Sequence, residues 1–190
     1  LSAKGHDWVA MMNETRMLID LSHVGYQTAI QAAQASKRPV ICSHSNARAL
    51  CDSLRNIPDE EIRAVAATGG TVGVTLWPPM LRHKERPTIE DFVAQVDYMV
   101  NLVGVEHVAF GSDLSERTKT EAEWHASFGP RGIYPEVTGI LGDWFIFTQR
   151  FTVGYESLAE TGRLIDALAA KHSADAVDKI MGGNLLRVYQ

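Results

Sequence analysis

Two histidines follow two short apolar segments that are each bounded like a buried β-strand. His23 follows the segment 17–22, and His44 follows the segment 39–43. The residues between them, 26–36, are rich in alanine and glutamine and are expected to form a helix. A strand–helix–strand crossover makes the two strands parallel neighbours, so both histidines are expected at the same carboxyl rim of the sheet. Two imidazoles side by side suit a zinc site, although histidines at strand ends are as often structural.

Other polar residues are expected at the same rim. Asp113 closes a later strand, where it could bind a metal, accept a proton, or cap the segment that follows. Arg55 lies in the loop after the second histidine, and a guanidinium suits a carboxylate, although a loop arginine is commonly only a solvated charge. Arg48 in the same loop competes for this role. Ser22 and Ser43 precede the histidines and could hydrogen-bond to them.

The pattern along the chain alternates between strands and helices. Strands are predicted at 17–22, 39–43, 70–76 and 107–111, and helices at 5–16, 26–36, 59–68, 88–103, 157–170 and 173–181. Such alternation is typical of a parallel sheet in an α/β fold. Four βα units are half of an eight-stranded (β/α)8 TIM-like barrel, which typically needs about 250 residues. The sequence therefore predicts that residues 1–190 form the C-terminal half of one barrel domain.

The segment 114–156 interrupts this alternation after the fourth predicted strand. Among its glycines and prolines it carries aromatic residues that include Trp124, Phe128, Tyr134, Trp144, Phe145 and Phe147. A long insertion after the carboxyl end of a strand is usually functional. We therefore expect residues 114–156 to line or cover the site.

Composition excludes several classes of protein. The formal net charge of −5 argues against a nucleic-acid-binding protein that neutralises phosphates, and no apolar run is long enough to cross a membrane. Cys42 and Cys51 are expected to be buried, unreactive thiols in a reducing compartment, which favours the cytoplasm. The chain begins without an initiator methionine or signal-peptide pattern, as the middle of a longer chain would. The other histidines do not share this strand-end position with a second candidate ligand, and we expect them at the surface: His6, His83, His107, His125 and His172.

Five short segments recur in a recognisable order along nearly the whole chain. They are DLSH at 20–23, SHSNAR at 43–48, RNIPD at 55–59, GSD at 111–113 and GGNLLR at 182–187. Together they resemble the renal (membrane) dipeptidase family of binuclear zinc peptidases. The resemblance implies a (β/α)8 barrel with two zinc ions at its carboxyl rim, and a metal-activated water that attacks a peptide carbonyl.

The same resemblance implies a role for each candidate residue. His23 and His44 would bind one zinc ion, Arg55 would bind the terminal carboxylate of the substrate, and Asp113 would handle a proton or the tetrahedral intermediate beside the metals. Two departures stand out. The family's His-x-Asp pair and bridging glutamate belong to the N-terminal half of the barrel, and Leu114 stands where an aromatic residue commonly follows the aspartate.

We therefore expect the C-terminal half of a zinc-dependent dipeptidase that requires the N-terminal half of its barrel. Alone, this chain is expected to bind zinc weakly, to hydrolyse nothing and to associate, for example as a homodimer. One alternative is a family relative without peptidase activity that acts on or binds another small molecule. The other is a metal-free α/β binding module whose histidines are structural.

Overall fold

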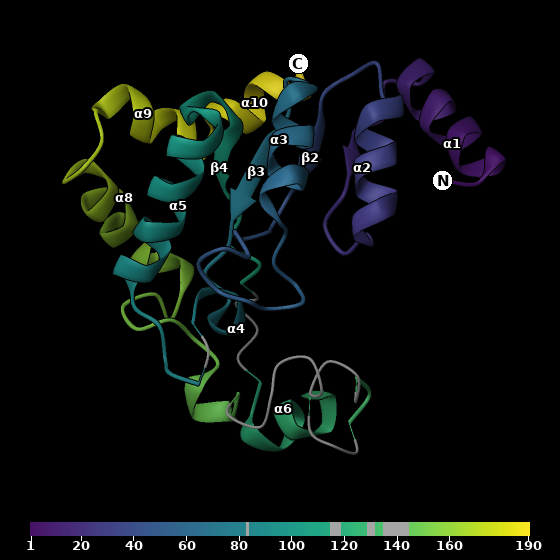
Figure 1. The fold of residues 1–190 in the computed structure, drawn as a ribbon. Coiled ribbons are helices and arrows are strands. Elements are labelled where there is room, and N and C mark those ends of the chain that lie inside the picture. The colour runs from purple at the N-terminus through teal and green to yellow at the C-terminus, as the bar shows by residue number, and fades with distance from the viewer. Residues whose placement is uncertain (83, 115–118, 129–131, 135–144) are drawn as a thin grey trace.

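The computed structural model describes residues 1–82, 84–114, 119–128, 132–134 and 145–190 (Figure 1). Its centre is a parallel sheet in the order β1-β2-β3-β4, as the alternating sequence pattern predicted. The strands are β1 (Ile19–Asp20), β2 (Val40–Cys42), β3 (Thr71–Val74) and β4 (Val108–Phe110). Each is shorter than its apolar segment, because strand pairing covers only the middle of each segment.

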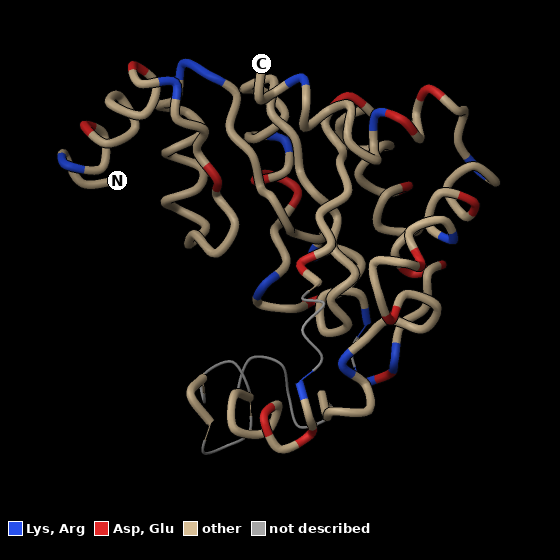
Figure 2. Tube along the Cα trace, turned by 180° about the vertical axis from the view of Figure 1, so that it is seen from behind, with Lys and Arg blue, Asp and Glu red and all other residues tan. Residues whose placement is uncertain are grey.

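Helices alternate with the strands along the chain, and the first helix precedes β1. They are α1 (Ala3–Glu14), α2 (Tyr26–Ala35), α3 (Asp59–Ala67), α5 (Ile89–Val103), α8 (Thr161–Ala169), α9 (Ala174–Asp178) and α10 (Asn184–Tyr189). Successive helices pack on one another, α1 on α2, α2 on α3, α3 on α5 and α5 on α8, so they form a layer beside the sheet (Figure 1). Acidic and basic side chains are interspersed along the described chain (Figure 2), which agrees with its modest net charge.

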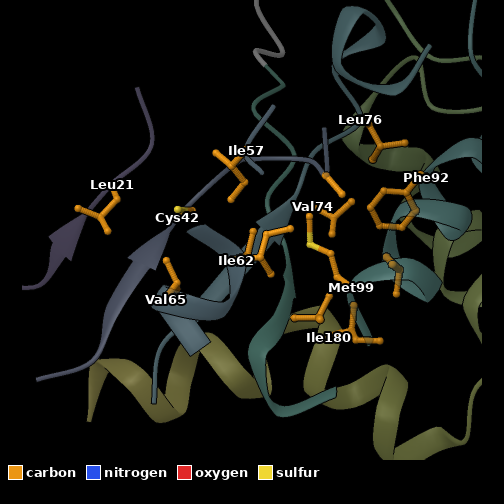
Figure 3. Packing of buried hydrophobic residues seen from close by; sticks show 14 of the residues in the cluster. Leu21, Cys42, Ile57, Ile62, Val65, Val74, Leu76, Phe92, Met99 and Ile180 are labelled. Atoms are coloured by element: carbon orange, nitrogen blue, oxygen red, sulfur yellow. The ribbon is translucent and has the colours of Figure 1, made fainter. Parts of the chain in front are cut away.

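The core lies between this helix layer and the sheet. Phe92 and Met99 on α5 are fully buried, and Ile62 on α3 packs into the same cluster beside Val74 of β3 (Figure 3). Burial of each such side chain contributes roughly 1.5–3 kcal/mol of transfer free energy. Thr88 is the N-cap of α5, and the Asp91 carboxylate accepts a hydrogen bond from its backbone N–H in a capping box.

The segment 182–187 near the C-terminus is bonded to the backbone at the amino ends of β3 and β4. The helical backbone is interrupted at Gly182, with φ of 163° and ψ of −27°, inside the segment η4 (Lys179–Gly183), and the chain then continues as α10. The side-chain amide of Asn184 donates to the backbone carbonyls of Val105 and Val108. The guanidinium of Arg187 donates to two further carbonyls nearby. The paired glycines therefore mark a kink between two helices, and the residues after it hold the end of the sheet opposite the histidines.

The loops beyond the carboxyl ends of β3 and β4 have structure that the sequence did not predict. Two short helices, α4 (Pro78–Leu81) and α6 (Glu121–Phe128), and the 3-10 turn η2 (Phe147–Gln149) lie in the loops beyond the carboxyl ends of the strands (Figure 1). Two further 3-10 turns are η1 (Val105–His107) and η3 (Leu158–Glu160). Trp144 and His83 lie outside the described residues. Among the residues that are described, no helix is both long and apolar enough to span a membrane.

Candidate metal site

His23 and His44 face each other at the carboxyl rim of the sheet. Asp20 and Ile41 are register partners in β1 and β2, and each histidine stands three residues beyond its partner position. The shared offset brings the two Nε2 atoms to 2.8 Å and the ring centroids to 4.9 Å, with the ring planes 57° apart. His23 adopts a left-handed backbone conformation, with φ of 64°, which is uncommon for a residue with a side chain. The sheet register therefore produces the convergence that the sequence predicted.

Two serines and an aspartate hold the strand ends around the imidazoles. Ser43 Oγ lies 2.8 Å from His44 Nδ1, and Ser22 Oγ accepts a 3.0 Å hydrogen bond from the His44 backbone N–H. The Asp20 carboxylate accepts from the backbone N–H groups of both serines, each at 3.0 Å. Burial alone would raise the pKa of Asp20, but these hydrogen bonds hold it below its usual value. An imidazole that donates Nδ1–H to the Ser43 hydroxyl keeps its Nε2 lone pair for a ligand.

The electrostatic surroundings favour a neutral imidazole at His23. Partial desolvation of the ring lowers the pKa of His23, and the nearby charges of Arg55 and His44 lower it further. The guanidinium Nη2 of Arg55 lies 3.2 Å from His23 Nε2. Only a neutral imidazole has a lone pair for a metal, so this environment prepares the ring for ligation.

Asp113 and Arg55 complete the group at the rim. Asp113 stands three residues after the end of β4, also with a left-handed backbone, with φ of 52°. One of its carboxylate oxygens lies 4.0 Å from His44 Nε2. Of the two arginines in the β2–α3 loop, the half-buried Arg55 reaches the histidines, whereas Arg48 donates to the Leu54 carbonyl at 3.5 Å. The structure thus separates two candidates that the sequence left open.

The remaining histidines fall into two groups. His6 and His125 are exposed, as expected. The expectation of a surface position is wrong for His107 and His172, which are partly buried and bonded to other elements. His107 Nδ1 lies 2.8 Å from the Gly70 carbonyl, and His172 Nε2 lies 2.8 Å from an Asp97 carboxylate oxygen. Both histidines join elements of the core and lie apart from the rim.

Two imidazoles and a carboxylate are suitable ligand types for zinc, and the convergent nitrogens fit half of such a site. Within the part of the chain that the structure describes, no group of three or more histidine, cysteine, aspartate or glutamate side chains could hold a metal ion. The two histidines can therefore supply only part of the ligands that a metal ion needs. The thiols cannot add to it, because Cys42 and Cys51 are buried and burial raises the pKa of each, that of Cys51 to about 11.

Sequence reasoning missed one residue at this rim. Trp77 stands three residues beyond Val74, whose register partner in β4 is Phe110. Asp113 stands the same distance beyond Phe110, so Trp77 and Asp113 leave neighbouring strands at equivalent positions, and both line the same pocket. The rule that located the histidines, a side chain just past a strand end, could have found Trp77.

The amino-acid sequence is similar to those of known dipeptidases and their relatives. The family described as membrane dipeptidase (peptidase family M19) matches residues 1–127. An uncharacterised protein in the pqqA 5′ region of Klebsiella pneumoniae is 37% identical over 118 residues, which are 60% of this chain and 44% of that protein. Dipeptidase aclJ of Aspergillus oryzae is 29% identical over 195 residues, which cover 99% of this chain and 38% of that protein.

Solved structures extend the likeness over the whole chain. An amidohydrolase from Pseudomonas aeruginosa superimposes with a TM-score of 0.83 at 30% identity, covering 100% of this chain and 56% of that one. A Rhodobacter sphaeroides metallo peptidase, bound to a phosphinate mimic of L-Ala-D-Ala, superimposes with a TM-score of 0.75 at 21% identity over 46% of its length. This chain spans less than half of the curated relatives described above and about half of these solved chains. The predicted fold, part of a TIM-like barrel, is confirmed.

Proposed function

We propose that this chain, which belongs to the membrane dipeptidase family, supplies the C-terminal part of a zinc-dependent dipeptidase. The observation that carries the proposal is the 2.8 Å approach of His23 Nε2 to His44 Nε2 at the carboxyl rim. Imidazole nitrogens with lone pairs repel one another at that distance unless a proton or a metal ion lies between them, and these nitrogens are common zinc ligands. The named dipeptidase relatives support peptide hydrolysis as the reaction class.

His23 and His44 would hold one zinc ion, and a zinc ion bound there lowers the pKa of a coordinated water and polarises a carbonyl. The protein's own contribution is orientation. Ser43 holds the His44 ring through Nδ1, and Ser22 holds its backbone, so the ring cannot turn away from the rim.

Arg55 would bind the terminal carboxylate of the substrate. Its guanidinium is half-buried beside His23, where a planar fork of donors can bond both carboxylate oxygens. Partial removal from water strengthens such a pair compared with one on an open surface. A carboxylate held there would place the adjoining peptide bond beside the two histidines.

Asp113 would accept and return a proton during hydrolysis. Its carboxylate reaches within 4.0 Å of His44 Nε2 and remains partly open to solvent at the rim. A carboxylate at this position can take a proton from an attacking water and deliver it to the leaving amine.

The rest of the enzyme would come from the N-terminal half of the barrel. Within the described residues, β1 pairs only with β2 and β4 pairs only with β3, so the sheet has two strand edges that a barrel would close. We propose that residues 1–190 form one domain with that half, and that the segment 114–156 borders the active site. The free, buried cysteines support a reducing location such as the cytoplasm.

A second candidate function is hydrolysis of another amide by the same machinery. The feature that favours it is the departure after Asp113, where Leu114 leads into the aromatic insertion. A panel of dipeptides, other amides and lactones assayed with the full-length protein separates the two candidates.

Metal analysis of the full-length protein tests the metal site itself. We expect His23→Ala and His44→Ala to lose about one zinc ion per chain and nearly all hydrolysis. His6→Ala is the matched control, because His6 is exposed on α1. Full zinc content in a His23→Ala/His44→Ala double variant would refute the assignment.

A further inference from the structure

Aromatic side chains of the insertion enclose a pocket directly beside Asp113. The pocket has a volume of about 160 Å³, and its walls include Trp77, Trp124 and Phe145. Asp113, whose carboxylate lies 4.0 Å from His44 Nε2, and Leu114 also line it. The pocket therefore continues from the candidate metal site into the insertion.

The aromatic walls are fixed by contacts with one another. Trp124 and Phe145 are buried and lie 5.5 Å apart between ring centroids, at 66°. Trp77 meets the same Phe145 ring at 5.6 Å and 75°. Edge-to-face contacts of this kind stabilise defined ring positions. Trp124 and Phe145 form the centre of a small hydrophobic cluster, separate from the main core, against which Trp77 packs.

Two cationic side chains also line the pocket, and both lie against aromatic rings. The guanidinium carbon of Arg150 lies 3.7 Å from the Phe147 ring centroid and 4.6 Å from that of Phe151. The ammonium of Lys119 lies 5.0 Å from the Phe128 ring centroid. Cations at the border of an apolar pocket favour an aromatic occupant over an aliphatic one, because a ring face attracts positive charge.

We propose that this pocket is a substrate subsite for an aromatic side chain of about the size of a benzene ring. The volume suits that occupant, since an apolar cavity of roughly 150 Å³ accommodates benzene. The inference rests on the proposed dipeptidase function for the identity of the ligand. The pocket itself depends only on described residues of this chain.

The order of groups along the rim identifies which substrate residue enters. Arg55 lies against His23, His23 lies against His44, and Asp113, which is 4.0 Å from His44, also lines the pocket. A dipeptide whose carboxylate is held by Arg55 and whose peptide bond lies at the histidines directs its N-terminal residue toward Asp113. The aromatic side chain in the pocket is therefore that of the N-terminal residue.

Kinetics of the full-length, zinc-loaded enzyme give the first arm of the test, with Ala-Gly, Leu-Gly, Phe-Gly and Gly-Phe as substrates. We expect kcat/KM for Phe-Gly to exceed that for Ala-Gly by about 10-fold or more, the usual effect of burying a phenyl ring. Trp124→Ala should abolish this preference, so that the ratio of kcat/KM for Phe-Gly to that for Ala-Gly falls to about one. The milder Trp124→Phe, which keeps the cluster packed, should reduce the preference. Trp8→Ala, at an exposed position on α1, is the matched control. Equal values for Phe-Gly and Ala-Gly would overturn the proposal.

Binding measured without turnover gives the second arm. Titration with L-phenylalanine amide should change the intrinsic tryptophan fluorescence, because two tryptophans line the pocket, whereas L-alanine amide should not. The change should persist in Trp8→Ala and disappear in Trp124→Ala. If no dipeptide is hydrolysed but this signal remains, the proposed function fails and the subsite stands. The same small response to both amides would refute the subsite, even in an active dipeptidase.

Discussion

Asn46 and Thr75 exchange two hydrogen bonds across the carboxyl ends of neighbouring strands. The Asn46 amide donates to the Thr75 carbonyl at 3.1 Å, and its oxygen accepts from the Thr75 N–H at 2.9 Å. The same amide also donates to the Met80 carbonyl at 3.0 Å. All of these groups are buried, so the loop that carries Arg55 is fastened to the end of β3.

Replacement of Asn46 by alanine should therefore weaken both the fold and the site. We expect Asn46→Ala to lower the free energy of unfolding by about 2–4 kcal/mol, because it leaves the buried N–H and carbonyl of Thr75 without partners. The Met80 carbonyl keeps the hydrogen bond that it accepts from Asn56. The loosened loop should also raise KM for dipeptides. Urea unfolding of the full-length protein measures the first effect, and Asn101→Ala, at an exposed position on α5, is the control. Equal midpoints for the two variants would contradict this account.

Arg55→Lys should impair substrate binding far more than turnover. A lysine ammonium keeps the charge but cannot form the bidentate pair with a carboxylate. Loss of one charge-assisted hydrogen bond should raise KM for dipeptides by about 10- to 100-fold, with a smaller change in kcat. Arg63→Lys, on the exposed side of α3, should leave both constants unchanged. Unaltered KM in Arg55→Lys would remove this residue from the substrate site.

Ser43→Ala should weaken zinc binding while leaving the fold intact. The Ser43 hydroxyl is 2.8 Å from His44 Nδ1, and partners of this kind typically change metal affinity by about 10- to 100-fold. Competition with a chromogenic chelator measures the change in the full-length protein. Ser157→Ala removes a hydroxyl that accepts from the Ala159 N–H, far along the chain from the histidines. Identical zinc affinity in the two variants would show that Ser43 does not hold the ring for metal.

Local sequence patterns located the residues whose positions follow from strand register. His23 and His44 could be paired from sequence because each follows an apolar strand by a fixed offset, and parallel register converts that offset into contact. Asp113 was found by the same rule. Which of Arg48 and Arg55 lies beside the histidines depends on the path of an irregular loop. Such a loop has no periodic sequence pattern from which its path could be predicted.

The aromatic pocket could not be predicted for a related reason. Trp124 and Phe145 are separated by a segment without regular pattern, and their contact arises only when the insertion folds onto Trp77. The terminal helix α10 was likewise hidden, because Gly182 interrupts the helical backbone, and the Asn184 amide fastens the helix that follows to the sheet. In each case tertiary contacts decided what local pattern left open.

Glu61 should make the stability of the fold depend on pH. Its side chain is buried on α3, and burial raises the pKa of Glu61 to about 7, although the charge of Arg48 acts in the opposite direction. A carboxyl whose pKa is higher in the folded than in the unfolded state stabilises the fold most when both states are protonated, below about pH 4.5. That contribution is lost as the pH rises through 7, and the loss amounts to about 3 kcal/mol at most.

Glu61→Gln stays neutral at every pH, so its Tm should fall less than that of the wild type between pH 5 and pH 8. Glu60→Gln, the exposed neighbour on the same helix turn, should retain the wild-type dependence. Parallel pH profiles for wild type and Glu61→Gln would show that Glu61 is charged in the folded protein across this range.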